Sequence, residues 1–464
     1  MSPHDLPLEV DRQDPRSLAI QLSDGLRAAA ASGALRTGDR LPSTRALATT
    51  LAVSRTVTAA AYEVLQAEGW IGGRRGAGTY VIAAPGLPAQ GLPAPKHPGP
   101  PRAQWQEPER GIDLRPGTPW ASGMCPAAWR RAWRAAADPP ILTRPVVAGL
   151  PEFRTAVVEH LVRHRGLAVQ PEVVLATGGC AAAVAELAAV LLRPGDVVAV
   201  EEPGYPRAVA TLRAAGMHVL PVPVDPEGLV VAALPDRARA VYCTPAHQFP
   251  LGATMSARRR LALVAWARER AAWVLEDDYD GELRHHGAPL PLLASVGPDV
   301  VVHLGTASKI LTPTLGVGWL AAPGEVVAAV CEYRSSTGMR PSPAGQRVLT
   351  ALAVSGDLAR HLRRVRRELL ARRELVVGAL RAAGLPVRGD QAGAHLVVEL
   401  SGGLDAERSA VRRSAGEGLL LDGLERCHDA PPRCHGVTLG YAAPGSRSTL
   451  AGALPGLTAL LTAS

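Results

Sequence analysis

Residues 273–280 read WVLEDDYD and residues 300–309 read VVVHLGTASK, and these two stretches decide the fold. Each is a short apolar run with a polar end, formed by Asp277, Asp278 and Tyr279 in the first and by Thr306, Ser308 and Lys309 in the second. Short apolar runs that end in this way are typical of buried strands. Segments with helical patterns separate them from further strand candidates. This alternation predicts an α/β domain with a mostly parallel sheet.

The other elements follow the same rhythm along the chain. Strands are predicted in VVLATGG (173–179), DVVAVEEP (196–203), Val219–Val224, Ala240–Thr244 and Gly316–Ala321, and helices in Ala181–Leu192 and Arg207–Ala215. Ligands of such sheets bind beyond the carboxyl ends of the strands. Gly178 and Gly179 open a helix, whose N–H groups favour a phosphate. With the polar strand ends they supply the amine, carboxylate, phenol, hydroxyls and anion site that pyridoxal phosphate (PLP) requires.

Lys309 is unusual because the chain has 50 lysine and arginine residues, of which only Lys96 and Lys309 are lysine. A Schiff base forms only from a neutral amine. Guanidinium stays protonated, whereas burial and neighbouring charges can lower the pKa of a lysine. Arginine therefore cannot replace lysine at a position that must bind an aldehyde covalently.

The composition is that of a globular protein of 464 residues with a formal charge of +8, which suits a partner rich in phosphate without requiring one. The N-terminus lacks the apolar core of a secretory signal, and the six cysteines have no CxxC spacing. We therefore expect a cytoplasmic protein with reduced thiols and no membrane span. The stretch CHDAPPRCH (427–435) matches no common zinc spacing, and no metal site is expected.

Seven prolines between Pro85 and Pro101 divide the chain, because such a segment holds neither a helix nor an inner strand. We expect a small domain at residues 1–83, a proline-rich linker at 84–111 and a large domain at 112–464. The length of the chain also exceeds what a single core usually holds.

The small domain has the pattern of a DNA-binding module. A helix is predicted over residues 17–30, and Ser43 and Ser54 are placed to cap helices over residues 44–51 and 55–68, which together make a helix-turn-helix. The sequence WIGGRRGAGTYVI (70–82) indicates two strands around a basic, glycine-rich tip, as in a wing. The alternative is a small helical domain with no DNA partner.

This part resembles the GntR-type winged helix, whose pattern it matches from "LPSTRALATTLAVSRTVTAAAYEVLQAEG" to "GAGTYV". The resemblance implies DNA contacts from Arg45, Ser54, Arg55, Thr56, Thr58, Gly76, Gly78 and Thr79. Ala60 stands where relatives often carry a basic residue, so one contact is expected to be missing.

The large domain resembles fold-type I aminotransferases, and the whole chain resembles the MocR/GabR regulators, in the ordered run GLPEFR, TGG, EEPGYP, YCTPAHQFPLG, EDDYDGELR and LGTASK. The resemblance implies that Lys309, the catalytic residue, anchors PLP, that Asp277 pairs with the pyridine nitrogen, and that Tyr205 stacks on the ring. Tyr279 would contact the ring 3-oxygen, with His247 or Gln248 in place of an asparagine that aminotransferases use there. Thr306, Ser308, Gly179 and Cys180 would hold the phosphate.

Three positions depart from that pattern. Gly316 replaces an arginine that faces the phosphate, a loss of about 1.5–3 kcal/mol. Arg144 stands where many relatives have a tyrosine that reaches the neighbouring subunit's phosphate, and we expect it to supply the missing charge in a homodimer. Thr438 replaces the arginine that clamps a substrate carboxylate, which leaves Arg207 as the candidate contact for an effector.

These features predict a transcriptional regulator that binds an operator in double-stranded DNA and senses an amino acid or amine through PLP. Two alternatives remain open. One is an active aminotransferase, for which Thr438 is unfavourable. The other is a repressor with a degenerate cofactor site, which Gly316 suggests.

Overall fold

The computed structural model describes residues 8–74, 78–82, 111–285, 290–389 and 391–463. The chain divides into two compact units, Met1–Glu107 and Pro108–Ser464, and each is described by itself. The predicted linker, apart from Gly111, lies outside the described residues. Among the helices within the described ranges, none has the length and apolar character needed to cross a membrane.

The small unit is a winged helix-turn-helix, as predicted. It consists of α1 (Leu18–Ala31), α2 (Thr44–Thr50) and α3 (Arg55–Ala67), followed by the antiparallel strands β1 (Ile71–Arg74) and β2 (Gly78–Val81). The side chains of Ser17, Ser43 and Ser54 each accept a backbone N–H in the first turn of the helix that follows. The apolar faces of the three helices meet in a core that includes Leu22, Leu26, Leu47 and Leu65.

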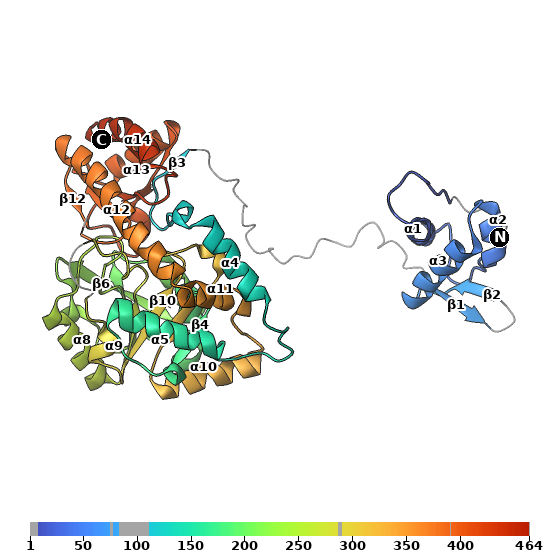
Figure 1. The fold of residues 1–464 in the computed structure, drawn as a ribbon, viewed down its shortest axis with the longest axis horizontal. Helices are drawn as coiled ribbons and strands as arrows, with labels where there is room; N and C mark the ends of the chain where they lie inside the picture. The colour runs from blue at the N-terminus through green and yellow to red at the C-terminus, as the bar shows by residue number, and fades with distance from the viewer. Residues whose placement is uncertain (1–7, 75–77, 83–110, 286–289, 390, 464) are drawn as a thin grey trace. The chain divides into compact units, whose positions relative to one another are not determined.

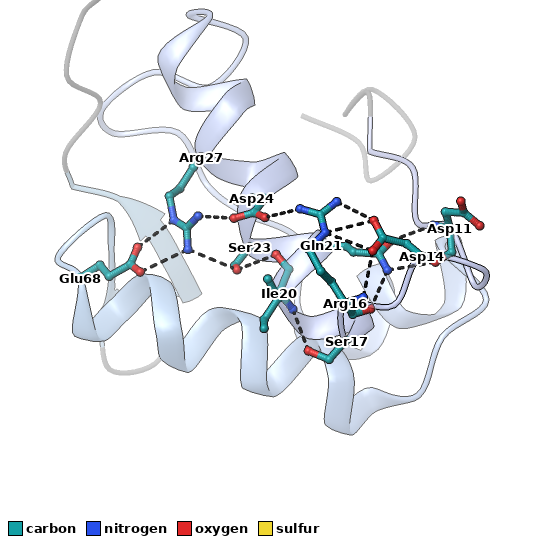
Figure 2. Close-up of polar contacts among 10 residues, drawn as sticks. All are labelled: Asp11, Asp14, Arg16, Ser17, Ile20, Gln21, Ser23, Asp24, Arg27 and Glu68. Atoms are coloured by element: carbon teal, nitrogen blue, oxygen red, sulfur yellow. Dashed lines mark hydrogen bonds and ion pairs between the residues drawn. The ribbon is translucent and has the colours of Figure 1, made fainter. Parts of the chain in front are cut away.

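Charged side chains link α1 to the end of α3 (Figure 2). Arg27 on α1 donates to Glu68 through Nε at 2.8 Å and also pairs with Asp24. Asp24 also forms an ion pair with Arg16, whose guanidinium pairs in turn with Asp14 at 2.6 Å. Exposed pairs of this kind contribute little individually, so the network supplements the apolar core and does not replace it.

The large unit is built on a sheet of eight strands in the order β4-β11-β10-β9-β8-β5-β6-β7 (Figure 1). Their bounds are β4 (Val174–Thr177), β5 (Val197–Glu202), β6 (His218–Asp225), β7 (Gly228–Leu229), β8 (Ala238–Cys243), β9 (Trp273–Asp277), β10 (Val301–Thr306) and β11 (Gly318–Ala321). The pairings from β10 through β9, β8 and β5 to β6 are parallel, whereas β11 is antiparallel to both neighbours. The predicted mostly parallel sheet is confirmed, and the polar ends of β9 and β10 lie side by side.

Helices cover both faces of this sheet. The α-helices described in the large unit, including α13 and α14 of its C-terminal part, are α4 (Pro126–Ala137), α5 (Pro151–Arg165), α6 (Cys180–Leu191), α7 (Pro206–Ala214), α8 (Ala257–Arg270), α9 (Leu293–Val296), α10 (Gly324–Thr337), α11 (Pro343–Val354), α12 (Asp357–Ala382), α13 (Gly403–Gly416) and α14 (Arg447–Thr462). Along β5, Val197 and Ala199 join one apolar cluster with α5, α8 and α11, while Val198 and Val200 join another with α6, α7 and α10. This alternation is what a strand buried on both faces requires.

A second, smaller sheet lies in the C-terminal part of the large unit. Its strands are β12 (Val387–Arg388), β13 (His395–Glu399), β16 (Gly436–Gly440) and β15 (Asp422–Gly423), in that order. A separate parallel pair joins β14 (Leu419–Leu420) to β3 (Ile112–Asp113). Residues 111–118, called the entry segment here, therefore run beside the C-terminal part of the unit, and Leu114 O accepts from Gly440 N at 2.7 Å.

Candidate functional site

A cavity of about 830 Å³ opens at the carboxyl ends of the central strands. Its walls come from the entry segment, from the loops after β4, β5, β8, β9 and β10, and from the second sheet. Almost all of the predicted cofactor and effector residues line it: Lys309, Asp277, Tyr279, Tyr205, Thr306, Ser308, Gly179, Cys180 and Arg207. The fold therefore collects in one place residues that lie up to about 130 positions apart in the sequence.

Lys309 follows β10, and its Nζ donates a hydrogen bond to the carbonyl oxygen of Gly117 in the entry segment at 2.8 Å. Burial lowers the pKa of Lys309; Arg207 acts in the same direction, while Asp280 and Asp277 oppose it. A lowered pKa raises the fraction of neutral amine, the form that reacts with an aldehyde. A Cβ at Gly117 would lie 3.0 Å from this Nζ, so the close approach of backbone and amine depends on glycine.

Asp277 ends β9 and is buried in the cavity wall. Its Oδ2 accepts a hydrogen bond from the Tyr242 hydroxyl at 2.5 Å, whereas its Oδ1 has no partner among the described residues. Burial raises the pKa of Asp277, and the hydrogen bond from Tyr242 opposes this. A buried carboxylate oxygen without a donor is costly, and the protonated ring nitrogen of PLP is a donor of the right kind. In this respect the residues present fit the cofactor.

The first turn of α6 supplies the anion side of the cavity. Gly178, Gly179 and Cys180 line it there, where the N–H groups of the helix N-terminus attract a phosphate, although the Gly179 N–H itself donates to Thr177 Oγ1 at 3.2 Å. Thr306 and Ser308 stand beside this turn; their hydroxyls lie 3.0 Å apart, and a Cβ at Gly179 would lie 3.6 Å from Thr306 Oγ1. Two hydroxyls and a helix N-terminus fit the phosphate group of PLP, although the cluster contains no cation.

The expectation for His247 and Gln248 needs correction, because neither lines the cavity. The amide nitrogen of Gln248 donates to Pro203 O at 2.8 Å and to Phe249 O at 2.6 Å, so it is used in holding a loop. His247 is buried behind Tyr279, with Nδ1 3.0 Å from the Tyr279 hydroxyl. Phe249 occupies the cavity wall instead, edge to face with Tyr205 at 5.6 Å.

The departures at Gly316 and Arg144 lie outside this cavity. Gly316 ends a short 3-10 turn with φ of 58°, and a Cβ there would meet no atom within 4 Å. Arg144 is exposed and lines a second cavity of about 340 Å³ together with Arg340. Within one chain, neither position adds a charge to the group of residues around Lys309.

Several cavity residues were missed by the sequence analysis. Tyr242 had a usable signal, because a phenol in a buried strand needs a partner. Arg115 and Arg426 had none, since strand pairing brings their segments together from opposite ends of the unit. Arg426 pairs with Asp422, whose backbone carbonyl accepts from Thr438 Oγ1 at 3.0 Å. Cations therefore line the cavity near Thr438, where the expected arginine is absent.

The predicted DNA-contact residues of the helices fall into two groups. Arg45, Arg55 and Thr56 are exposed, and Ser54 is exposed while its hydroxyl caps α3. Thr58 is instead fully buried, and its hydroxyl donates to Thr44 O at 2.9 Å. Its assignment as a DNA contact is corrected here, because it fastens α3 to the start of α2 and has no exposed surface.

In the wing, Gly78 is exposed and Thr79 is half-buried, while Gly76 lies outside the described residues. A Cβ at Gly78, where φ is 107°, would come within 2.9 Å of the Arg40 Nε. Arg40, which the sequence analysis did not select, bridges to Tyr80 through its backbone and is exposed. It adds an exposed cation beside the wing.

The chain matches two protein families. Residues 18–81 match the bacterial regulatory proteins of the gntR family, and residues 115–422 match aminotransferase class I and II. Among solved structures, an archaeal alanine:glyoxylate aminotransferase aligns with a TM-score of 0.71 at 24% identity, over 76% of this chain and 91% of that one. That likeness supports the fold of the large unit.

Three similar curated proteins are transcriptional regulators that match more than four fifths of this chain. The HTH-type pyridoxine biosynthesis transcriptional regulator PdxR of Corynebacterium glutamicum is 37% identical over 81% of this chain and 82% of its own. The HTH-type transcriptional regulator TauR of Rhodobacter capsulatus is 34% identical over 84% and 85%, and the probable rhizopine catabolism regulatory protein MocR of Rhizobium meliloti is 32% identical over 94% and 92%. The chain therefore belongs to the aminotransferase class I and II family, among the transcriptional regulators that join this domain to a GntR-type DNA-binding domain.

Proposed function

We propose that the protein is a DNA-binding regulator that holds PLP at Lys309 and changes its affinity for an operator when an amine or amino acid enters the cavity. The observation that carries this proposal is the placement of Lys309 and of the unpartnered Asp277 Oδ1 in one cavity, beside the N-terminus of α6. PLP, when bound, supplies an aldehyde for amines and a ring that withdraws electrons.

Each wall of the cavity has a separate task in this proposal. Lys309 presents a nucleophilic amine, Asp277 holds the proton of the ring nitrogen, and the first turn of α6 binds the phosphate. Arg207 and Arg426 supply guanidinium groups for a carboxylate on the ligand. A ligand then shifts the regulator only through a difference in its affinity for two arrangements of the chain.

The first test is spectroscopic. Purified wild-type protein should gain visible absorption with PLP, and borohydride should then fix the label on Lys309. Lys309→Ala should lose both signals, while Lys96→Ala, which removes the other lysine, should keep them. A visible band and a label that survive in Lys309→Ala would refute the assignment of the covalent residue.

The second test concerns DNA. Duplexes selected from a random library by the wild-type protein should bind with an affinity that changes on adding PLP and an amino acid. Arg55→Ala should weaken binding to all selected duplexes and lower its dependence on salt, because a phosphate or base contact is lost. Multiple turnovers with a keto acid, without any effect on DNA binding, would favour the aminotransferase alternative.

A second candidate signal is PLP itself. Thr438 removes the usual carboxylate clamp, and one relative is named for the regulation of pyridoxine biosynthesis. In that case PLP alone would change DNA binding, and added amino acids would have no further effect. Titrating the DNA complex first with PLP and then with amines separates the two signals.

A further inference from the structure

His247 lies behind the cavity wall and contacts two neighbours with one nitrogen. Its Nδ1 is 2.8 Å from Asp280 Oδ2 and 3.0 Å from the Tyr279 hydroxyl oxygen. The side chains of His247 and Asp280 are 3% and 4% exposed, so water does not compete for these contacts. A Cβ at Gly393 would come within 2.5 Å of both side chains, which shows how closely the second part of the unit encloses them.

The two contacts at Nδ1 determine which of His247, Asp280 and Tyr279 donates a hydrogen bond and which accepts one. An ionised carboxylate accepts only, so Nδ1 must carry the proton that it donates to Asp280. A protonated Nδ1 is no acceptor for the Tyr279 hydroxyl, and its proton must therefore point elsewhere. Tyr279 lines the cavity, and Phe249 beside it offers no polar side-chain atom. Two acceptors are then open to this proton, a ring oxygen in the cavity and the Asp280 carboxylate, and Asp280 is already engaged by His247 Nδ1.

The surroundings maintain these protonation states. Burial raises the pKa of Tyr279, and Asp280 adds to the effect, so the phenol keeps its proton. Asp280 raises the pKa of His247 against burial and against Arg284. His395, the other titratable group packed against His247, has its pKa lowered to about 3 by burial and then by His247, so it stays neutral.

We propose that His247 and Asp280 are positioning residues that act through Tyr279, keeping its hydroxyl proton directed at the ring oxygen of the bound cofactor. This inference rests on the proposed function, and it replaces the direct contact that the sequence suggested for His247. Phe249, which stands in the cavity wall beside Tyr279, offers no hydrogen-bond donor to the ring oxygen. In this proposal the ring oxygen therefore receives its hydrogen bond from Tyr279, and His247 and Asp280 set the direction of that hydroxyl.

The experiment is a double-mutant cycle read in the visible spectrum of the PLP-loaded protein. A hydrogen bond donated to the ring oxygen favours its ionised form and lowers the pH midpoint of the visible band. His247→Phe and Tyr279→Phe should each raise that midpoint, by about half a pH unit or more. The double variant should match Tyr279→Phe alone, whereas an effect of His247 through Asp280 or His395, which also line the cavity, would add to the shift.

His247→Gln provides a second variant should the phenylalanine not fold, and it should raise the midpoint in the same direction. Exposed His218→Phe is the control and should leave the midpoint unchanged. A midpoint unmoved in both His247 variants, or additive shifts in the double variant, would overturn the inference while leaving PLP binding intact. A wild-type protein that shows no visible band with PLP would instead overturn the proposed function.

Discussion

At the end of β9, five carboxylates occur between Glu276 and Glu282, and each has its own partner. Glu276 accepts backbone N–H groups at the start of α9, Asp277 accepts from Tyr242, Asp278 is held by Arg165, Asp280 by His247 and Glu282 by His160. Buried carboxylates persist only when paired in this way. Together the pairs fix the register of the strand end that presents Asp277 and Tyr279 to the cavity.

Glu201 is a buried carboxylate whose hydrogen bonds are made by one of its two oxygens. Thr244 donates to its Oε2 at 2.5 Å, but its Oε1 is buried without a partner among the described residues. Burial raises the pKa of Glu201 from 4.5 to about 7, so the folded protein favours the protonated form. The contribution of Glu201 to stability should therefore be fully present below about pH 4.5 and fall as the pH rises to about 7, by about 2–3 kcal/mol.

Glu201→Gln should remove this pH-dependent loss of stability. As the pH is raised from 5 to 8, the unfolding temperature of the variant should therefore rise relative to that of the wild type. Thermal unfolding at several pH values measures the difference. Exposed Glu227→Gln is the matched control and should follow the wild type throughout. Parallel pH profiles for wild type and Glu201→Gln would contradict the assignment.

At the scale of elements, a buried ion pair joins α10 to α6. Arg334, with no exposed side-chain surface, donates to both oxygens of Glu186 at 2.7 and 2.8 Å. It also donates to Val147 O and Ala176 O, each at 2.8 Å. The helix whose first turn faces the cavity is thereby fixed to the loop before α5 and to β4.

Removing the carboxylate leaves a guanidinium buried without its counter-ion. Glu186→Ala should cost about 3–5 kcal/mol of unfolding free energy. Asp299→Ala provides the control, because Arg268 holds Asp299 with the same two-pronged geometry at 49% and 53% exposure. That loss should be under about 1 kcal/mol. Equal losses in a chemical denaturation series would mean that burial does not decide the effect.

Elements with a strong local pattern were predictable from the sequence. The strands that end at Asp277 and Thr306 and the capped helices at Ser43 and Ser54 all appear where the pattern puts them. The second sheet was not predicted, because β12 and β15 are only two residues long and the pairing of β13 with β16 joins residues about 40 positions apart. Thr58 was misassigned because a sequence motif identifies only its place in the chain. The packing of α2 on α3 decides whether its side chain faces the core or the solvent.

At the scale of the whole molecule, the phosphate cluster of Gly179, Cys180, Thr306 and Ser308 contains no cation among the described residues, while exposed Arg144 lines a different cavity. Ile141, close to it in the chain, is 93% exposed, which suits a surface covered by a second copy. We expect a homodimer in which Arg144 completes the partner's phosphate site. This arrangement was predicted from the sequence and stays a prediction.

Arg144→Ala should weaken PLP retention by about tenfold or more, as the loss of a charge-assisted contact implies. Dialysis against buffer, followed by the visible spectrum, measures the retention. Exposed Arg433→Ala, which lines neither cavity, should retain PLP like the wild type. Equal retention in both variants would exclude a role for Arg144.

The hydrogen bond from Lys309 to Gly117 has one more consequence. The nitrogen that would bind the cofactor also donates a hydrogen bond to the entry segment, the backbone by which the chain enters the large unit. Any event that removes the hydrogens from that nitrogen breaks the contact at Gly117, while the backbone bonds of Ile112 and Leu114 keep the start of the segment in place. Occupation of the cavity is thereby coupled to the backbone that follows the linker.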